Sequence, residues 1–209
     1  MEQKNYWNSV SDTKTFTTPF QAEEFKKYVS KNDIILDIGC GYGRTLEELH
    51  KSGYENLIGV DFAEDMIRKG RKLYPYLDLK VSNGEKIELP DESVDAVILF
   101  AVLTCISDDN KQISLLKEIY RVLKPNGNLY INDFLLNTDE RNTSRYQKFA
   151  DKYTYGVFEL PEGAICRHHD KKWIISLLSG FKKERFEPLT FTTMNGNKSN
   201  GFFFIGSKQ

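Results

Sequence analysis

The sequence predicts a doubly wound α/β fold, in which a mostly parallel sheet carries helices on both faces. Short apolar runs recur along the first two thirds of the chain, as expected for strands buried on both sides. The segments between these runs place apolar residues at helical spacing, and a glycine-rich turn joins the first run to the next helical segment. Because strands that alternate with helices require right-handed crossovers, the helices are expected on both faces of the sheet.

The alternating elements can be assigned in order along the first two thirds of the chain. The first predicted strand covers residues 34–38 and stops at Gly39. The elements expected after it are a helical segment around 46–50, a strand over 57–61, a helix over 63–73, strands over 77–81 and 94–102, a helix over 110–123 and a strand over 128–135. The last of these helices has Leu116 and Ile119 on one face and ends at the turn signal Lys124-Pro125-Asn126-Gly127.

The regular alternation of strands and helices ends after Leu136. The elements expected there are a polar helix around 141–152, an irregular aromatic stretch as far as Cys166, a helix over 170–178 and two final strands over 181–186 and 201–205. The loop over 190–200, rich in Thr, Asn and Gly, is predicted to be an exposed hairpin connection. No internal repeat or Pro-rich linker divides the chain, so residues 1–209 are expected to form a single domain.

Composition narrows the possible functions. The chain has 209 residues with 40% hydrophobic and 28% charged side chains, which is typical of a globular protein. Its formal net charge is -1, so nucleic acid is not an expected partner. The longest apolar stretch, over 94–106, is too short to span a bilayer, and the N-terminus does not resemble a secretory signal. We therefore expect no membrane span and a cytoplasmic location.

The cysteines give no sign of a disulfide or a metal site. Cys40, Cys105 and Cys166 are odd in number and show no CxxC spacing. His168, His169 and Asp170 are too close in sequence to hold a metal ion without strain. No metal is therefore expected.

The glycine turn predicts a site for a nucleoside cofactor. Gly39, Gly41 and Gly43 follow the first strand directly, so a ligand can lie against bare backbone beside a helix N-terminus. Asp61 ends the next strand, close to the spacing expected for an acid that binds ribose hydroxyls. A dinucleotide fingerprint would need glycine where Arg44 stands, which argues against a pyrophosphate cofactor.

Four segments together resemble the class I S-adenosylmethionine-dependent methyltransferases. ILDIGCGYGR, GVDFAEDMI, NGEKIELPDESVDAVI and LKEIYRVLKPNGNLYI occur in that family's order over about residues 33–135. The likeness is to the small-molecule type, similar to the ubiquinone and menaquinone methyltransferase group. It implies a seven-stranded, mostly parallel, Rossmann-like sheet with an antiparallel last strand, and S-adenosyl-L-methionine as the methyl donor.

The resemblance also implies which residues bind the cofactor. They are Asp37, Gly39, Cys40, Gly41, Asp61, Phe62, Glu85, Lys86 and Phe100. Asp37 would order the glycine turn near the methionine end, and Asp61 would take the ribose hydroxyls with Phe62 beside the adenine. Glu85 would accept a hydrogen bond from the adenine amino group, while Lys86 contributes its backbone amide. Phe100 would face the methionine portion through its carbonyl.

Two segments are expected on the substrate side. Ligands of open α/β sheets bind beyond the carboxyl ends of the strands, and both the N-terminal segment 1–30 and the insert 136–169 feed that edge. Tyr6, Trp7 and Tyr153 are the aromatic residues predicted to contact substrate beneath a lid-like insert. The alternative is that these rings are ordinary core.

His168 is the candidate general base. The resemblance supports it, because related enzymes often carry a histidine just before the helix that follows the insert. The same side chain could instead cap that helix or hydrogen-bond the insert.

The predicted activity is methyl transfer to a small-molecule acceptor by in-line displacement, in which alignment within a dry pocket supplies most of the catalysis. A general base would help only where the acceptor must lose a proton. The alternatives are a catalytically idle cofactor-binding or scaffold protein and, opposed by Arg44, a nicotinamide-dependent oxidoreductase.

Overall fold

The computed structural model describes residues 3–13, 16, 18–84, 86–193 and 196–209. The helices are α1 (Gln3–Ser9), α2 (Ala22–Phe25), α3 (Arg44–Lys51), α4 (Glu64–Leu73), the 3-10 turn η1 (Leu103–Cys105), α5 (Asp109–Val122), α6 (Glu140–Lys148) and α7 (Lys171–Leu177). The strands are β1 (Ile35–Ile38), β2 (Leu57–Asp61), β3 (Asp78–Val81), β4 (Val94–Phe100), β5 (Leu123–Phe134), β6 (Val157–Glu159), β7 (Ile165–Arg167), β8 (Phe181–Thr192) and β9 (Lys198–Lys208).

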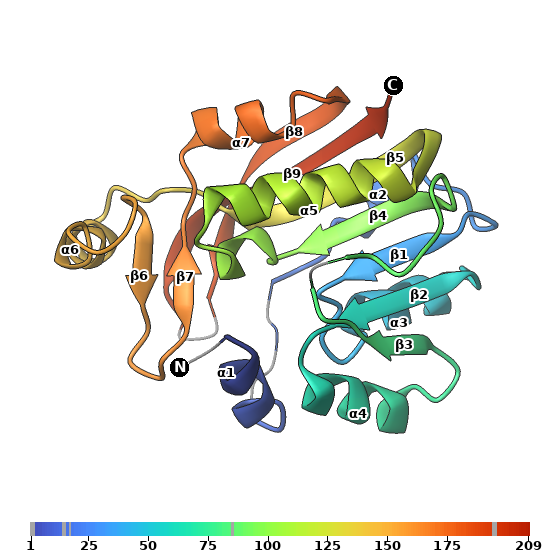
Figure 1. The fold of residues 1–209 in the computed structure, drawn as a ribbon, viewed down its shortest axis with the longest axis horizontal. Coiled ribbons are helices and arrows are strands. Elements are labelled where there is room, and N and C mark those ends of the chain that lie inside the picture. The colour runs from blue at the N-terminus through green and yellow to red at the C-terminus, as the bar shows by residue number, and fades with distance from the viewer. Residues whose placement is uncertain (1–2, 14–15, 17, 85, 194–195) are drawn as a thin grey trace.

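Seven strands form one sheet in the order β3-β2-β1-β4-β5-β9-β8 (Figure 1). Strands β1 to β5 run parallel to one another, whereas β9 runs antiparallel to both β5 and β8. The predicted fold, a mostly parallel seven-stranded sheet whose last strand is antiparallel, is confirmed. Strands β6 and β7 form a separate antiparallel hairpin.

Helices cover both faces of the sheet because its inner strands are apolar on both sides. Consecutive residues Ile35 and Leu36 belong to different apolar clusters, since side chains of a strand alternate between faces. Ile35 packs in the cluster that contains Leu46 of α3, and Leu36 in the cluster that contains Leu116 of α5. The result is three layers, with α2 and α3 on one face and α5 and α7 on the other.

The structure corrects the prediction for residues 190–200. This segment is mostly strand, because β8 and β9 pair as far as Thr192 with Lys198. Phe191 is buried against Phe134, with ring centroids 5.0 Å apart. The polar composition of the segment therefore hid the buried residues of a long hairpin.

A second correction concerns the aromatic stretch before Cys166, which was expected to be irregular. It contains the β6–β7 hairpin, whose strands have only three residues each and so leave a weak pattern in the sequence. Helices α1 and α2, at seven and four residues, were likewise not predicted.

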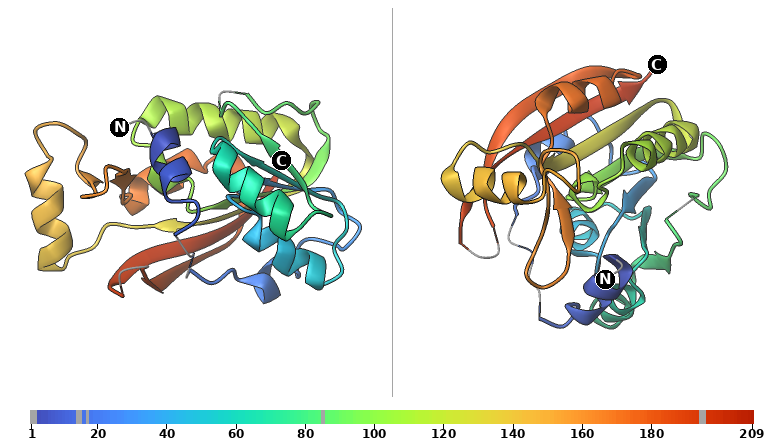
Figure 2. Two further views of the ribbon diagram at one scale, coloured as in Figure 1. Left: turned by 90° about the horizontal axis from the view of Figure 1, so that it is seen from below. Right: turned by 60° about the vertical axis from the view of Figure 1, so that its left-hand side comes forward.

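The carboxyl ends of the parallel strands all point to the same edge of the sheet (Figure 1). Helix α1, the β6–β7 hairpin and α6 lie beyond this edge, as Figure 2 also shows. The residues of the N-terminal segment and of the insert are thus gathered where ligands of open α/β sheets bind.

Candidate active site

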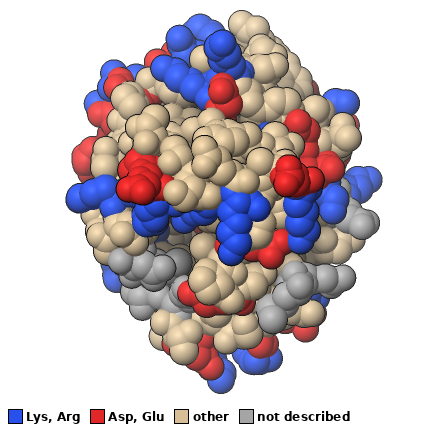
Figure 3. Space-filling model, turned by 90° about the vertical axis from the view of Figure 1, so that its left-hand side faces the viewer, with Lys and Arg blue, Asp and Glu red and all other residues tan. Residues whose placement is uncertain are grey.

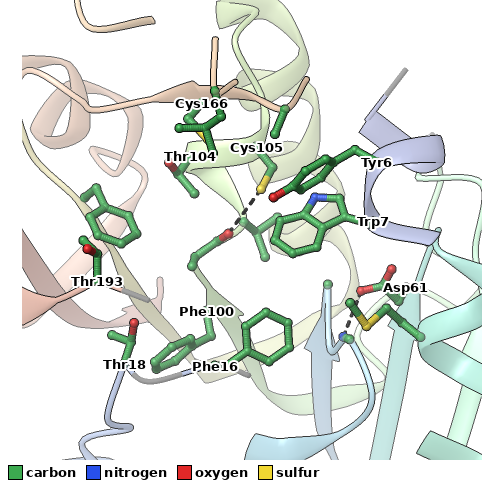
Figure 4. A pocket seen from close by; sticks show the side chains of 18 of the residues that line it. Tyr6, Trp7, Phe16, Thr18, Asp61, Phe100, Thr104, Cys105, Cys166 and Thr193 are labelled. Carbon is green, nitrogen blue, oxygen red and sulfur yellow. Dashed lines mark hydrogen bonds between the residues drawn. The ribbon is translucent and has the colours of Figure 1, made fainter. Parts of the chain in front are cut away.

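A cavity opens at the carboxyl edge of the sheet. Its floor is formed by the β1–α3 turn and by the ends of β2 and β4, while α1, the β6–β7 hairpin and α6 supply its other walls (Figure 4). Most of its surface is aromatic or aliphatic, with a few charged side chains at defined places. Such a lining is typical of a small-molecule binding site.

The glycine turn exposes backbone to this cavity. Gly39, Gly41 and Gly43 have φ values of 72°, 55° and 85°, a region in which residues with a Cβ are strained. Gly39 also approaches Val102 so closely that a Cβ would lie 2.6 Å from a Val102 methyl carbon. Gly39 N–H donates to the carbonyl of Val60 at 2.8 Å, which fixes the turn to the end of β2.

Asp61 holds the glycine turn in place. One carboxylate oxygen accepts from Gly41 N–H at 2.8 Å and the other accepts from Ala63 N–H at 2.8 Å. Burial raises the pKa of Asp61 above its usual value, and the backbone hydrogen bonds oppose this shift. Because a carboxylate has about four lone-pair sites, Asp61 keeps acceptor capacity for a ligand in the cavity.

Asp37 has a buried acceptor atom without a partner. The side chain is only 1% exposed, and its Oδ1 has no hydrogen-bond donor within the described part of the chain. Burial first, and then the charge of Asp61, raise the pKa of Asp37 well above its usual value, while Arg44 lowers it. An orphaned acceptor of this kind is expected to bind a donor group of a ligand.

The N-terminal segment closes the cavity above the glycine turn. Phe16 stacks on Tyr42 with ring centroids 5.4 Å apart, and a Cβ on Gly41 would lie 3.2 Å from the Phe16 ring. Tyr6 and Trp7 of α1 also line the cavity, and the ring centroids of Trp7 and Phe16 are 6.1 Å apart (Figure 4).

Helix α1 is attached to the rest of the wall through Gln3. Its side-chain amide donates to the carbonyl of Cys105 at 3.2 Å and to that of Ile165. The first helix is thereby joined to η1 and to β7, far from it in sequence. The cavity wall is a contact between three segments rather than a single loop.

Comparison with known proteins identifies a methyltransferase domain in this chain. A methyltransferase-domain family model matches residues 36–131. A solved S-adenosylmethionine-dependent methyltransferase from Methanosarcina mazei is 29% identical, with a TM-score of 0.84 over 92% of this chain and 99% of that one. Residues 36–131 of this chain therefore form a methyltransferase domain, and the chain as a whole is similar to class I S-adenosylmethionine-dependent methyltransferases.

Curated relatives match about half of this chain. A methyltransferase-like protein of Schizosaccharomyces pombe is 34% identical over 112 residues, covering 54% of this chain and 41% of that protein. A demethylmenaquinone methyltransferase of Streptomyces avermitilis is 31% identical over 100 residues, covering 48% and 42% of the two chains. The match thus spans less than half the length of these relatives.

Most of the predicted site residues line this cavity. These are Tyr6, Trp7, Asp37, Gly39, Cys40, Gly41, Asp61, Phe62, Phe100 and His168. Lys86 is exposed and is not among the lining residues. Glu85 lies outside the described residues.

Tyr153 is not brought to the cavity, contrary to the prediction that it contacts substrate there. Its hydroxyl donates to Glu159 at 2.8 Å, on the outer side of the hairpin. Phe158, in the same insert, is 2% exposed and does line the cavity. The density of aromatic residues therefore located the segment but not the residue.

His168 lines the cavity but both of its ring nitrogens are engaged. Nδ1 lies 2.6 Å from the hydroxyl of Tyr146, and Nε2 lies 3.4 Å from a terminal nitrogen of Arg145. Burial first, and then the charge of Arg145, lower the pKa of His168 well below its usual value. The side-chain amide nitrogen of Asn137 also lies 3.2 Å from Nδ1, so hydrogen-bond donors face both nitrogens of the ring.

The sequence analysis missed the arginines of the cavity. Arg44 begins α3 and lies 5.3 Å from the centre of the Phe100 ring, while Arg141 and Arg145 reach the cavity from α6. The i,i+4 spacing of the last two was a usable signal, since it places two like charges on one face of a helix at a cost.

The described residues contain no group of three His, Cys, Asp or Glu that could hold a metal ion. None of the described helices is long and apolar enough to cross a bilayer.

Proposed function

We propose that this chain transfers a methyl group from S-adenosylmethionine to a small-molecule acceptor. The observation that carries the proposal is the glycine turn with Asp37 and Asp61 facing one cavity, whose remaining walls come from α1 and the insert. The cofactor side and the acceptor side of the cavity would then be continuous, as a direct transfer requires.

The residues on the cofactor side fit S-adenosylmethionine. Asp61 would bind the ribose hydroxyls with the lone pairs that the backbone leaves free, and Phe62 would lie beside the adenine. The unpartnered Oδ1 of Asp37 suits a donor group of the methionine portion. Glu85, Lys86 and the carbonyl of Phe100 keep the roles that the family resemblance implies, and these remain predictions.

Gly39, Cys40 and Gly41 would give the bound cofactor room against the backbone. A Cβ on Gly41 would lie 3.2 Å from the Phe16 ring, closer than an ordinary van der Waals contact, so a side chain would have little space there. When bound, S-adenosylmethionine supplies an electrophilic methyl group on a sulfonium.

The acceptor would be held by the N-terminal segment 1–30 and the insert 136–169. Tyr6 and Trp7 on one side and Phe158 on the other supply apolar surface that excludes water. A nucleophile aligned in such a dry pocket needs little further assistance. Location in the cytoplasm stays a prediction.

The base role of His168 stays a prediction that its surroundings do not favour. A general base needs a free lone pair and a pKa near the working pH. The pKa of His168 is lowered by burial, its Nε2 faces Arg145 and its Nδ1 is in contact with Tyr146 and Asn137. These contacts favour a role in positioning Arg145.

Two measurements test the proposed function together. Calorimetry with S-adenosylhomocysteine should show one site per chain, and a metabolite extract given methyl-labelled S-adenosylmethionine should yield a labelled small molecule. Absence of binding to folded protein would refute the proposal. Binding without any labelled product would favour the idle cofactor-binding alternative, while binding of a reduced nicotinamide cofactor instead would favour an oxidoreductase.

A further inference from the structure

Arg145 is a cation without an anionic partner at the far end of the cavity. It lines the hairpin chamber, the part of the cavity bounded by Phe134, Arg145, Phe158 and His168. Among the described residues, no carboxylate forms an ion pair with Arg145, and its Nε is buried without a hydrogen-bond acceptor. Burial of a guanidinium without a compensating charge is costly, and here it lowers the pKa of Arg145.

The guanidinium is held rigidly despite lacking an acid. It lies over the Phe158 ring, 3.7 Å from the ring centre, and donates toward His168 Nε2 at 3.4 Å. The His168 ring is in turn stacked on Phe134, with centroids 5.3 Å apart and an interplanar angle of 11°. Its other nitrogen meets Tyr146. A cation fixed in this way is ready to bind a ligand with little loss of side-chain entropy.

Arg141 strengthens the positive charge at the same place. It lies one helical turn before Arg145 and also lines the cavity. Two positive charges at this spacing on a helix repel each other. Its own acidic neighbour, Asp139, is 3.8 Å away and half exposed. An anion between the two arginines would relieve the repulsion.

The charge is directed at a ligand inside the cavity rather than at an extended surface. Figure 3 shows that basic and acidic side chains are interspersed over the face that carries α6 and the hairpin. Helix α6 is also separated from the glycine turn by the hairpin and η1, so Arg145 lies on the acceptor side (Figure 1).

We propose that the methyl acceptor is an anion, with a carboxylate or phosphate group that Arg145 binds in the hairpin chamber and an apolar body that lies against Phe134 and Phe158. This inference rests on the proposed methyl transfer. Arg145 is a specificity-determining residue in this arrangement, and His168 is a positioning residue that orients its guanidinium.

The test uses three probes of one shape and different charge. Phenylphosphate, phenylacetate and the neutral phenylacetamide are titrated by calorimetry into full-length protein saturated with S-adenosylhomocysteine, at constant ionic strength. At least one anion should bind about tenfold or more tightly than phenylacetamide, as charge-assisted hydrogen bonds to arginine predict. The tighter of the two anions assigns the acceptor group as phosphate or carboxylate.

Variants connect the preference to one residue. Arg145→Gln should abolish the preference for the anion, and Arg145→Lys should retain only part of it because lysine lacks the planar fork. Lys148→Gln removes the same charge from an exposed position of α6 and should bind the anion like the wild type. Melting temperature and affinity for S-adenosylhomocysteine establish that each variant is folded.

Equal binding of the neutral and charged probes, or an unchanged preference in Arg145→Gln, would overturn the inference. It would also be overturned if Arg145→Gln weakened binding of S-adenosylhomocysteine, because Arg145 would then serve the cofactor. Failure of the wild type to bind S-adenosylhomocysteine counts against the proposed function itself. The two failures are therefore distinguishable.

Discussion

Asp61 has two tasks that are separable by substitution. Its carboxylate fixes the glycine turn through Gly41 and Ala63, and we propose that it also binds the ribose hydroxyls. Asp61→Ala should weaken binding of S-adenosylhomocysteine by about 1.5 to 3 kcal/mol, because hydrogen bonds to a charged acceptor are lost. Calorimetry measures the change. Asp61→Asn, which retains one acceptor oxygen, should lose less, and an unchanged dissociation constant in both variants would remove Asp61 from the site.

Asp133 makes stability depend on pH. It is fully buried at the end of β5 and accepts from Phe134 N–H at 2.7 Å and Thr104 N–H at 3.2 Å, and burial raises its pKa to about 7. The protonated form is therefore favoured in the folded state, so its contribution to stability is complete below pH 4 and is lost as the pH rises to 7. The free energy of unfolding, measured against Asp133→Asn, should fall by up to about 1.4 kcal/mol per pH unit over this range.

The comparison with Asp133→Asn isolates this carboxyl from its histidine neighbour. His169 Nδ1 lies 4.0 Å from Asp133, and burial lowers the pKa of His169 to about 4. Its titration reduces stability as the pH falls from about 6.5, the opposite direction, and it is present in both proteins. A difference between the two proteins that does not vary with pH would contradict the prediction.

At the scale of single residues, sequence reasoning located the cofactor side better than the acceptor side. The glycine turn, Asp37 and Asp61 follow directly from strand ends, so their meeting at one sheet edge is predictable from topology. Arg145 and Phe158 reach the cavity through the path of the insert, which no local pattern specifies. Tyr153 shows the consequence, since it is close in sequence to Phe158 and yet outside the cavity.

The insert offers a matched pair of aromatic residues for testing its role. Phe158→Leu should impair methyl transfer while leaving the affinity for S-adenosylhomocysteine near that of the wild type, because the insert is proposed to hold only the acceptor. Tyr153→Leu should leave both quantities nearly unchanged. Turnover of the labelled acceptor from the extract is the measurement. The reverse order of effects would place the acceptor outside the hairpin.

Helix α1 provides a spectroscopic signal for ligand binding. Of the two tryptophans in the chain, Trp7 lines the cavity. Trp173 does not line it, and its indole N–H donates to the side-chain oxygen of Gln112 at 2.8 Å. Adding S-adenosylhomocysteine should shift tryptophan emission, since a ligand in the cavity changes the surroundings of the Trp7 ring. Trp7→Phe should abolish the shift and Trp173→Phe should retain it. A shift that survives in Trp7→Phe would mean that α1 does not cover the ligand.

Element boundaries were predictable where the apolar pattern is long. Strand β2 occupies its predicted residues, and helix α5 ends at Val122. The turn expected at residues 124–127 is wrong, because these residues belong to β5, which begins at Leu123. The short elements α1, α2, β6 and β7 escaped prediction because three to seven residues contain less than two periods of a helix or little alternation of a strand. Of these short elements, α1, β6 and β7 form walls of the site.

For the molecule as a whole, the sheet order was the most predictable property. Right-handed crossovers and the family resemblance together determine where β1 to β5 lie, and the antiparallel strand β9 follows from the resemblance. The closing of the cavity by Gln3, through carbonyls of Cys105 and Ile165, depends on contacts between residues 102 and 162 positions apart in the sequence. Such contacts leave no periodic trace in the sequence.

The position of β9 has a consequence for synthesis on the ribosome. Strand β9 follows every other strand in the chain but lies between β5 and β8, so β5 stays an open edge until residues 198–208 have been made. During that interval, the unpaired N–H and C=O groups along β5 can pair with another nascent chain. The sheet is therefore complete only after β9 has been made, and a chain interrupted before β9 would be a target for chaperones and prone to aggregation.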